Sequence, residues 1–114
     1  MKTVSFRGEK DTIGNYAFVG CTGLQSLYFT GTVQTIGNYA FAASFDDSLT
    51  SALTKAEFQG NAPTSFGSNV FDGASTVFTI YSFPDDDSWD NGKETNGNMT
   101  YWNGYLWDEL QLSV

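Results

Sequence analysis

The heptapeptide TIGNYAF occupies residues 12–18 and returns, letter for letter, at residues 35–41. A looser copy, FGSNVF, follows at residues 66–71 and keeps the spacing of the template Ile-Gly-x-x-Ala-Phe. A fixed period of this kind constrains the fold more than any other feature, because units of about 23 residues cannot bury their apolar faces alone and must stack. The repeat therefore predicts a solenoid.

In such a solenoid, equivalent letters of neighbouring coils occupy equivalent places. The phenylalanine that closes each copy is then expected to lie in one ladder of Phe18, Phe41 and Phe71. The glycine of the template is expected to serve a special backbone conformation or a close approach that a Cβ would obstruct. The apolar spacing inside each copy also predicts one or two turns of α-helix or 3₁₀ helix.

Four short alternating runs accompany the template and predict strands with one buried face: Val4-x-Phe6, Leu27-x-Phe29, Ala56-x-Phe58 and Phe78-x-Ile80. Their middle residues are expected to line up on the solvent face of a parallel sheet, the concave side of this architecture. We take them as the candidate partner-binding face: Ser5, Tyr28, Glu57 and Thr79. Tyr28 is the best single anchor, because it offers a flat apolar area and a hydroxyl.

Residues 42–51 add about six positions to the third unit. Phe45 and Leu49 stand at helical spacing there, which predicts a short helix on the side of the solenoid. Ser44 or Asp46 would cap its N-terminus.

The repeat pattern stops after Phe83, and the following residues contain all three tryptophans. A solenoid end needs a cover, so we predict a repeat domain over residues 1–83 and a C-terminal cap over residues 84–114. In this cap Trp102, Tyr105 and Trp107 are expected to close over the last coil. No comparable cover precedes the first strand, which makes pairing of two copies through the first coil a hypothesis.

Charge and composition exclude several functions. The chain has thirteen acidic and five basic residues, which gives a formal net charge of -8 and disfavours direct binding to nucleic acid. No apolar run approaches the ~18 residues of a membrane-spanning helix. The chain has no histidine, so it offers neither a Cys/His nor a Ser/His pair, and we expect no enzyme and no cofactor.

The sequence gives little support for a metal site. Asp85, Asp87 and Asp90 invite a calcium interpretation, but the loop fails the spacing of the EF-hand template and reads as a solvated loop. The single cysteine, Cys21, stands in none of the usual zinc spacings.

The stretch AFVGCTGLQSLYF, residues 17–29, resembles the BspA-like (Treponema pallidum type) leucine-rich repeat. The residues that match its pattern are Ala17, Phe18, Cys21, Leu24, Leu27 and Phe29. The resemblance implies an α/β repeat solenoid: a short right-handed superhelix of three to four coils, with parallel strands on one side and the Cys21 thiol in the packed interior. It also implies a place on bacterial or protozoan surface proteins that bind host or matrix macromolecules.

Two functions follow as expectations. The first is a noncatalytic interaction module, the C-terminal repeat segment of a bacterial surface or adhesion-type protein, which binds a protein or an extracellular-matrix macromolecule at the cell surface or as part of a longer secreted chain. The alternative is a small stand-alone acidic protein in the cytoplasm. Its negative second half would bind and inhibit a basic, nucleic-acid-binding partner.

Overall fold

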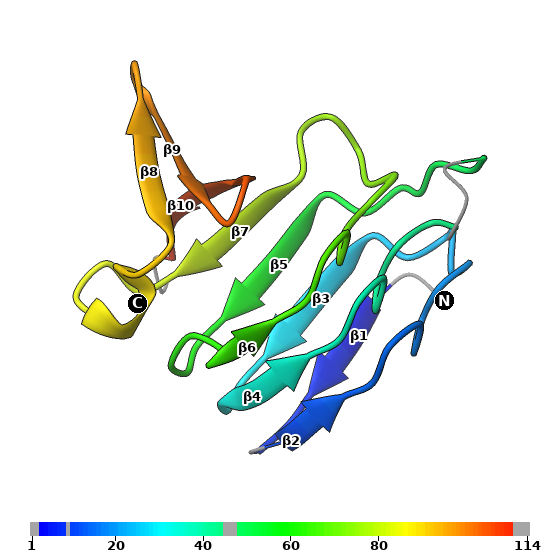
Figure 1. Cartoon of the computed structure of the whole chain (residues 1–114), viewed down its shortest axis with the longest axis horizontal. Coiled ribbons are helices and arrows are strands. Elements are labelled where there is room, and N and C mark those ends of the chain that lie inside the picture. Colours follow the sequence, from blue (N-terminus) through cyan, green and yellow to red (C-terminus); the bar gives the residue numbers. More distant parts are fainter. Residues whose placement is uncertain (1–2, 9, 45–47, 111–114) are drawn as a thin grey trace.

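The chain winds into a solenoid with two sheets on different sides (Figure 1). The repeat strands pair in parallel, whereas β9 pairs antiparallel with β10 and β8 at one end of the larger sheet. This is a computed structural model, and it describes residues 3–8, 10–44 and 48–110. The larger sheet has the strand order β1-β3-β5-β7-β10-β9-β8, and the smaller one has the order β2-β4-β6. The strands are β1 (Thr3–Phe6), β2 (Lys10–Ile13), β3 (Ser26–Phe29), β4 (Val33–Ile36), β5 (Lys55–Phe58), β6 (Ser65–Phe66), β7 (Thr79–Ser82), β8 (Lys93–Asn96), β9 (Met99–Trp102) and β10 (Tyr105–Glu109).

The copies of the repeat lie in register, as the sequence predicted. In the smaller sheet Ile13 pairs with Ile36, and Ile36 pairs with Phe66. In the larger sheet the inward positions of β1, β3, β5 and β7 also follow one another across the strands. Equivalent residues of neighbouring coils are therefore in contact along the solenoid, which has about four turns.

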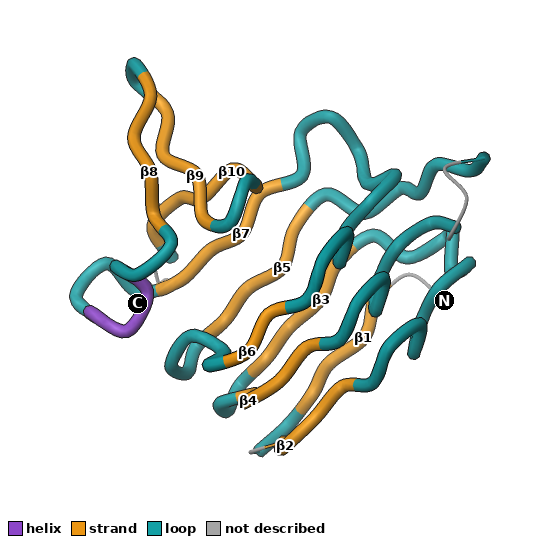
Figure 2. Tube along the Cα trace, in the orientation of Figure 1, coloured by secondary structure: helices purple, strands orange, loops and turns teal. Residues whose placement is uncertain are grey.

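The expected helices are replaced by strands and turns (Figure 2). Among the described residues the only helix is the 3₁₀ helix η1 (Asp87–Trp89). The start of the first two copies is extended because it is rich in β-branched residues, such as Thr12 and Ile13 in the first, which favour strands. A helix then cannot continue, because Tyr16 and Tyr39 adopt φ angles of 62° and 57°.

The predicted helix within residues 42–51 is not found in the part of that segment that the structure describes. Its expected core residue Phe45 and its expected cap Asp46 lie outside the described residues. Ser44 does act as a cap of another kind, since its hydroxyl accepts hydrogen bonds from the backbone N–H groups of Ser48 and Leu49. No helix in the described ranges is long and apolar enough to cross a membrane.

Two phenylalanine ladders form the core. In the first, the ring of Phe41 stacks on Phe18 at 5.2 Å between centroids and on Phe71 at 5.8 Å, which confirms the predicted ladder. The second ladder comes from the larger sheet and runs through Phe6, Phe29 and Phe58, with centroid distances of 4.9 and 4.4 Å. Phe29 and Phe58 are 0% and 1% exposed, so each ring is enclosed by its neighbours on both sides.

The asparagine and the glycine of the repeat connect one coil to the next. The side-chain oxygen of Asn15 accepts a hydrogen bond of 2.7 Å from the backbone N–H of Asn38, and Asn38 Oδ1 does the same for Ser68. This contact leaves no room for a Cβ on Gly37, which would lie 2.6 Å from the backbone nitrogen of Asn15. The close approach expected of the glycine is thus real, whereas a special φ is not required there.

Aromatic side chains that follow Phe83 pack against phenylalanines of the last repeat units, Phe58, Phe66 and Phe71. Trp89 lies 5.0 Å from Phe58, and Trp102 lies 4.7 Å from Phe66. Tyr105 places its ring edge against Phe71 at 5.2 Å, and its hydroxyl accepts a hydrogen bond of 3.1 Å from the Phe71 backbone N–H. Both tryptophans are buried, so their rings belong to the same apolar core as the phenylalanines.

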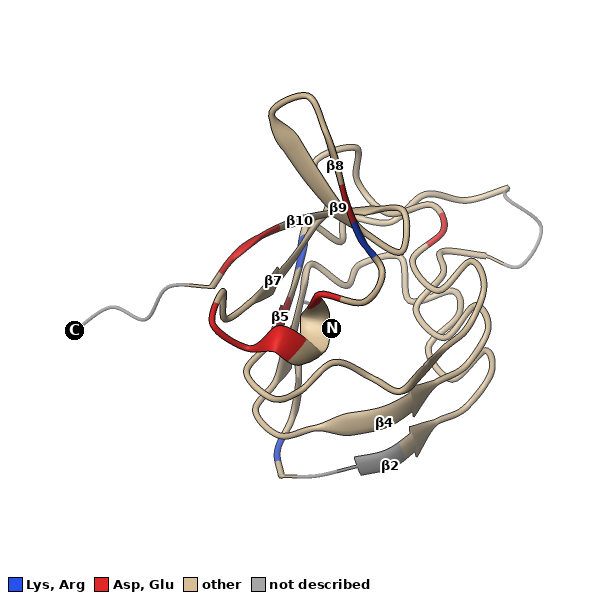
Figure 3. Cartoon of the chain, turned by 60° about the vertical axis from the view of Figure 1, so that its left-hand side comes forward, with Lys and Arg blue, Asp and Glu red and all other residues tan. Residues whose placement is uncertain are grey.

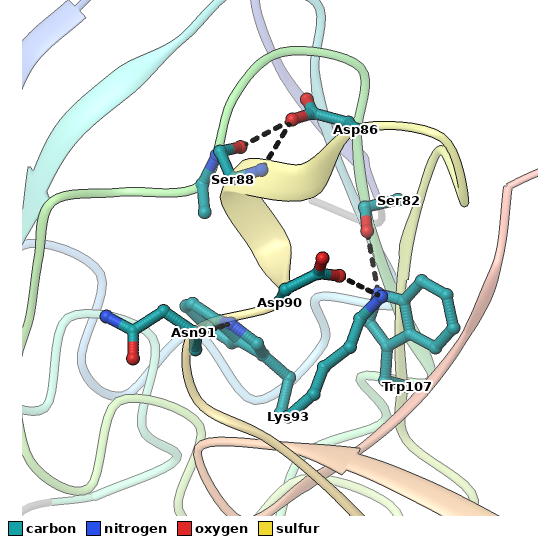
Figure 4. Close-up of polar contacts among 9 residues, drawn as sticks. Ser82, Asp86, Ser88, Asp90, Asn91, Lys93 and Trp107 are labelled. Atoms are coloured by element: carbon teal, nitrogen blue, oxygen red, sulfur yellow. Dashed lines mark hydrogen bonds and ion pairs between the residues drawn. The ribbon is translucent and has the colours of Figure 1, made fainter.

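Trp107 takes a different position from Trp102 and Tyr105. It belongs to β10, which extends the larger sheet as a fifth parallel strand beside β7. Its indole N–H donates to the Ser82 hydroxyl at 2.6 Å, while the Lys93 ammonium lies 3.7 Å above its ring and 3.6 Å from Asp90 (Figure 4). Ser82 holds the place that phenylalanine holds in β3 and β5, and Trp89 packs on Phe58, the last ring of that ladder.

The glycine contact generates a matched pair of variants. Gly37→Ala should lower the free energy of unfolding by roughly 1–3 kcal/mol, because the added methyl group meets the Asn15 backbone, which cannot move without disturbing the coil. Gly14→Ala is the control, since a Cβ there finds nothing within 4 Å. Its effect should stay within about 1 kcal/mol of zero. Urea unfolding followed by tryptophan fluorescence measures both, and equal losses would contradict the close approach.

Tyr105→Phe tests the contact between the C-terminal residues and the first ladder. The variant keeps the ring but leaves the Phe71 N–H without its hydrogen-bond acceptor, so the free energy of unfolding should fall by about 1–3 kcal/mol at pH 7.

Burial is also the main cause that raises the pKa of Tyr105 above its ordinary value of 10.0. The stability that comes from the neutral phenol is fully present below the unfolded pKa and is lost as the pH rises through the higher folded pKa. Urea unfolding between pH 7 and 11 should show this alkaline loss in the wild type and less of it in Tyr105→Phe.

Candidate interaction face

The outward side of the larger sheet presents two parallel rows of side chains. Strands β3, β5 and β7 alternate half-buried and buried residues, which means that every second side chain points to solvent. The first row, in strand order, is Ser5, Tyr28, Glu57, Tyr81 and Asp108. The second row is Thr3, Ser26, Lys55, Thr79 and Leu106.

Three of the four residues predicted for this face, Ser5, Tyr28 and Glu57, therefore stand side by side. Thr79 shares the face but lies in the second row, beside Lys55, and Tyr81 occupies the place next to Glu57. The expected register was wrong by two residues in this strand, because Phe78 was taken as its first inward residue. Phe78 instead packs 4.6 Å from Phe71, in the first phenylalanine ladder.

Lys55, Glu57 and Tyr28 form a small charged cluster at the centre of the face. Lys55 Nζ lies 2.9 Å from Glu57 Oε2 and 5.1 Å from the centre of the Tyr28 ring. Glu57 is the largest cause that raises the pKa of Lys55, and Tyr28 is the next. The ammonium group is thus held between a carboxylate and an aromatic ring, and Glu57 is engaged in an ion pair rather than free to act as a base.

An open pocket of about 400 Å³ lies on the same face, where β5, β7 and β10 run side by side. Its lining residues are Lys55, Glu57, Tyr81, Asp108, Glu109 and Leu110. Sequence reasoning missed Asp108 as part of this face and Glu109 as part of the pocket lining, because nothing in their surroundings indicated that β10 would join the sheet.

Cys21 is exposed, so the expectation of a buried thiol was wrong. The corresponding position of the next coil is Ser44, which is only 8% exposed. The difference arises because Cys21 belongs to the first coil and has a coil on one side only. With no histidine in the chain, the thiol has no imidazole base to activate it.

The acidic residues at 85–90 have structural roles near η1. Asp86 accepts hydrogen bonds from the backbone N–H and the hydroxyl of Ser88 and so caps the 3₁₀ helix (Figure 4). Asp90 pairs with Lys93. In the described part of the chain no group of three or more Asp, Glu, Cys or His side chains is arranged to hold a metal ion.

A family model described as BspA type leucine rich repeat region (6 copies) matches residues 1–85. No curated protein and no solved structure matches the sequence significantly. The family model covers three quarters of the chain and the same coils whose strands and phenylalanine ladders stack in register. This chain belongs to the BspA-type leucine-rich repeat family, whose repeat solenoid is typical of noncatalytic protein-interaction modules.

Proposed function

We propose that this chain is a noncatalytic protein-interaction module that binds its partner on the outward side of the larger sheet. The observation that carries the proposal is the in-register row of Ser5, Tyr28, Glu57 and Tyr81 across four parallel strands. Such a row is rigid, because each strand is fixed by hydrogen bonds on both sides or by the core beneath it. A rigid face that displays tyrosines loses little conformational entropy when it binds, which favours affinity.

Binding is a better account of this face than catalysis. Glu57 is neutralised by Lys55, and the exposed thiol of Cys21 lies outside the larger sheet without a histidine partner. General acid–base or nucleophilic chemistry needs groups that activate one another at hydrogen-bond distance. The face instead presents tyrosine, a residue enriched in protein interfaces, beside an ion pair and small polar side chains.

We further propose that the chain acts as the C-terminal repeat segment of a bacterial surface or adhesion-type protein, with a protein or extracellular-matrix macromolecule as partner. Family membership supports the repeat part of this proposal. The aromatic contacts of Trp89, Trp102 and Tyr105 support a division into a solenoid over residues 1–83 and a cap over residues 84–114.

Binding to a panel of purified extracellular-matrix proteins tests the proposed face. Tyr28→Ser should weaken the complex at least tenfold, because it removes the central aromatic anchor of the face. Tyr16→Ser is the matched control, since Tyr16 is an exposed tyrosine on the turns outside the larger sheet. Biolayer interferometry measures both affinities, and thermal melts check that both variants fold.

Equal affinities of the two variants would contradict the proposed face. Binding to a cationic nucleic-acid-binding protein instead of a matrix protein, with an affinity that falls steeply as salt is added, would favour the alternative of an acidic cytoplasmic inhibitor.

We propose that two copies of the chain pair through the first coil wherever no preceding repeat covers it. Val4, Phe6 and Phe18 are only partly buried, whereas their counterparts Leu27, Phe29 and Phe41 are 0–3% exposed. Among the described strands, β1 and β2 also have one neighbour each in their sheets. A second copy placed against this coil would cover apolar side chains and unpaired strand edges together.

Size-exclusion chromatography with light scattering, run over a wide concentration range, measures this pairing. We expect a mass that rises toward the dimer with concentration, and a Phe18→Arg variant that stays monomeric because it puts a charge on the contact. A wild-type monomer at the highest concentration would rule the pairing out.

A further inference from the structure

The pocket beside Tyr81 differs in charge from the rest of the sheet face. Its lining residues include three acidic ones, Glu57, Asp108 and Glu109, and one basic one, Lys55. Asp108 shares the outward row with Tyr81, whereas Glu109 pairs with Ser82 and its side chain leaves the strand on the other side. The Lys55 ammonium group already pairs with Glu57. In the described ranges the two ion pairs are Lys55–Glu57 and Lys93–Asp90, so neither Asp108 nor Glu109 has a cationic partner among those residues.

The acidic residues at this end of the molecule reinforce the charge of the pocket. Figure 3 shows Asp and Glu at the end of β10 and in the turn that follows β7, and the basic residue that lines the pocket is Lys55. The formal net charge of the whole chain is -8. A field of one sign attracts oppositely charged groups and raises their rate of encounter with the site.

The sheet contains the same arrangement twice. Tyr28 stands beside a carboxylate on the next strand, Glu57, and Tyr81 likewise stands beside Asp108. In the first arrangement the chain supplies its own cation, because the Lys55 ammonium lies 2.9 Å from Glu57 and 5.1 Å from the Tyr28 ring. The first arrangement shows what a tyrosine and a carboxylate at this spacing can hold, and the second opens onto the pocket.

We propose that Tyr81 and Asp108 bind an arginine side chain from an extended segment of the partner protein, and that the nearby Glu109 adds negative charge at the edge of the pocket. This inference rests on the proposed function and names the chemistry of its partner. A guanidinium group is planar, so it can stack on the Tyr81 ring while its N–H groups donate to the Asp108 carboxylate. The pocket has a volume of about 400 Å³ and is open to solvent, so a side chain can enter it from the face of the sheet.

Arginine fits the pocket better than the other charged side chains do. An acidic side chain would be repelled by the carboxylates of Glu57 and Asp108. Lysine would supply charge but could not make the paired, planar hydrogen bonds of a guanidinium group. The partner segment does not bind by adding a strand to the sheet beside β7, because β7 is already paired with β5 and β10. The pocket opens on the face of the sheet instead.

A peptide titration of the full chain tests the assignment. The probe is an eight-residue peptide of Gly and Ser with one central arginine, and its two controls carry citrulline or lysine at that position. Citrulline keeps the shape of arginine and removes its charge. Proton–nitrogen NMR spectra follow the titration, so that weak binding is detected and located residue by residue.

We expect the arginine peptide to shift the backbone signals of Tyr81, Asp108 and Glu109, with at least a tenfold weaker effect of the citrulline peptide. Asp108→Asn should weaken arginine binding about tenfold. Glu94→Gln is the control variant, because it removes one negative charge from an exposed position on β8 and should change binding less than twofold. The spectrum of each variant also shows directly whether the chain remains folded.

Equal binding of the arginine and citrulline peptides, or an unchanged affinity in Asp108→Asn, would overturn the proposal. Equal binding of the lysine peptide would overturn the stacking and paired hydrogen bonds of the guanidinium group. These outcomes are separate from the proposed function. If the partner still loses affinity with Tyr28→Ser while the peptide gives no shifts at Tyr81, the sheet face is retained and only the arginine site is lost.

Discussion

Face-to-face packing of phenylalanine rings from successive coils is the interaction on which the rest of the molecule depends. Parallel strands repeat at about 4.8 Å, and stacked rings prefer nearly the same separation. The Phe29–Phe58 and Phe18–Phe41 distances of 4.4 and 5.2 Å satisfy both requirements at once. Backbone hydrogen bonds and ring contacts therefore favour the same register. The outward rows of the larger sheet follow from that register, because the side chains between the inward ones must point to solvent.

The sequence was sufficient to predict the solenoid, the register of the copies and the ladder through Phe41, because each depends on spacing alone. It was not sufficient to predict the smaller sheet. Apolar residues four and five positions apart fit a helical face as well as a strand followed by a turn, and only the positive φ of Tyr16 and Tyr39 decides between them. The exposure of the Cys21 thiol also could not be predicted from the repeat pattern. The same residue is buried in an inner coil and exposed in an outer coil, because an outer coil has a neighbour on one side only.

The candidate face was predictable in part for a related reason. Ser5, Tyr28 and Glu57 follow directly from the alternation of buried and exposed residues in β1, β3 and β5. Tyr81 was missed because the inward position after it is Ser82, a polar residue that becomes acceptable in the core only through its hydrogen bond with Trp107. Asp108 and Glu109 depend on the same contact, as it helps to hold β10 beside β7. Partners distant in sequence thus determine the end of the face that differs most from the repeat pattern.

The hydrogen bonds from Asn38 to Asn15 and from Ser68 to Asn38 have a direction, since each coil offers a side-chain oxygen to the coil after it. A coil inserted between two others would find an acceptor below and a donor above, and would leave no group unsatisfied. An insertion of a few residues at Gly37 would instead separate the oxygen from its donor. Proteins built in this way can lengthen or shorten during evolution only by whole turns, with the variable stretches confined to the loops between them.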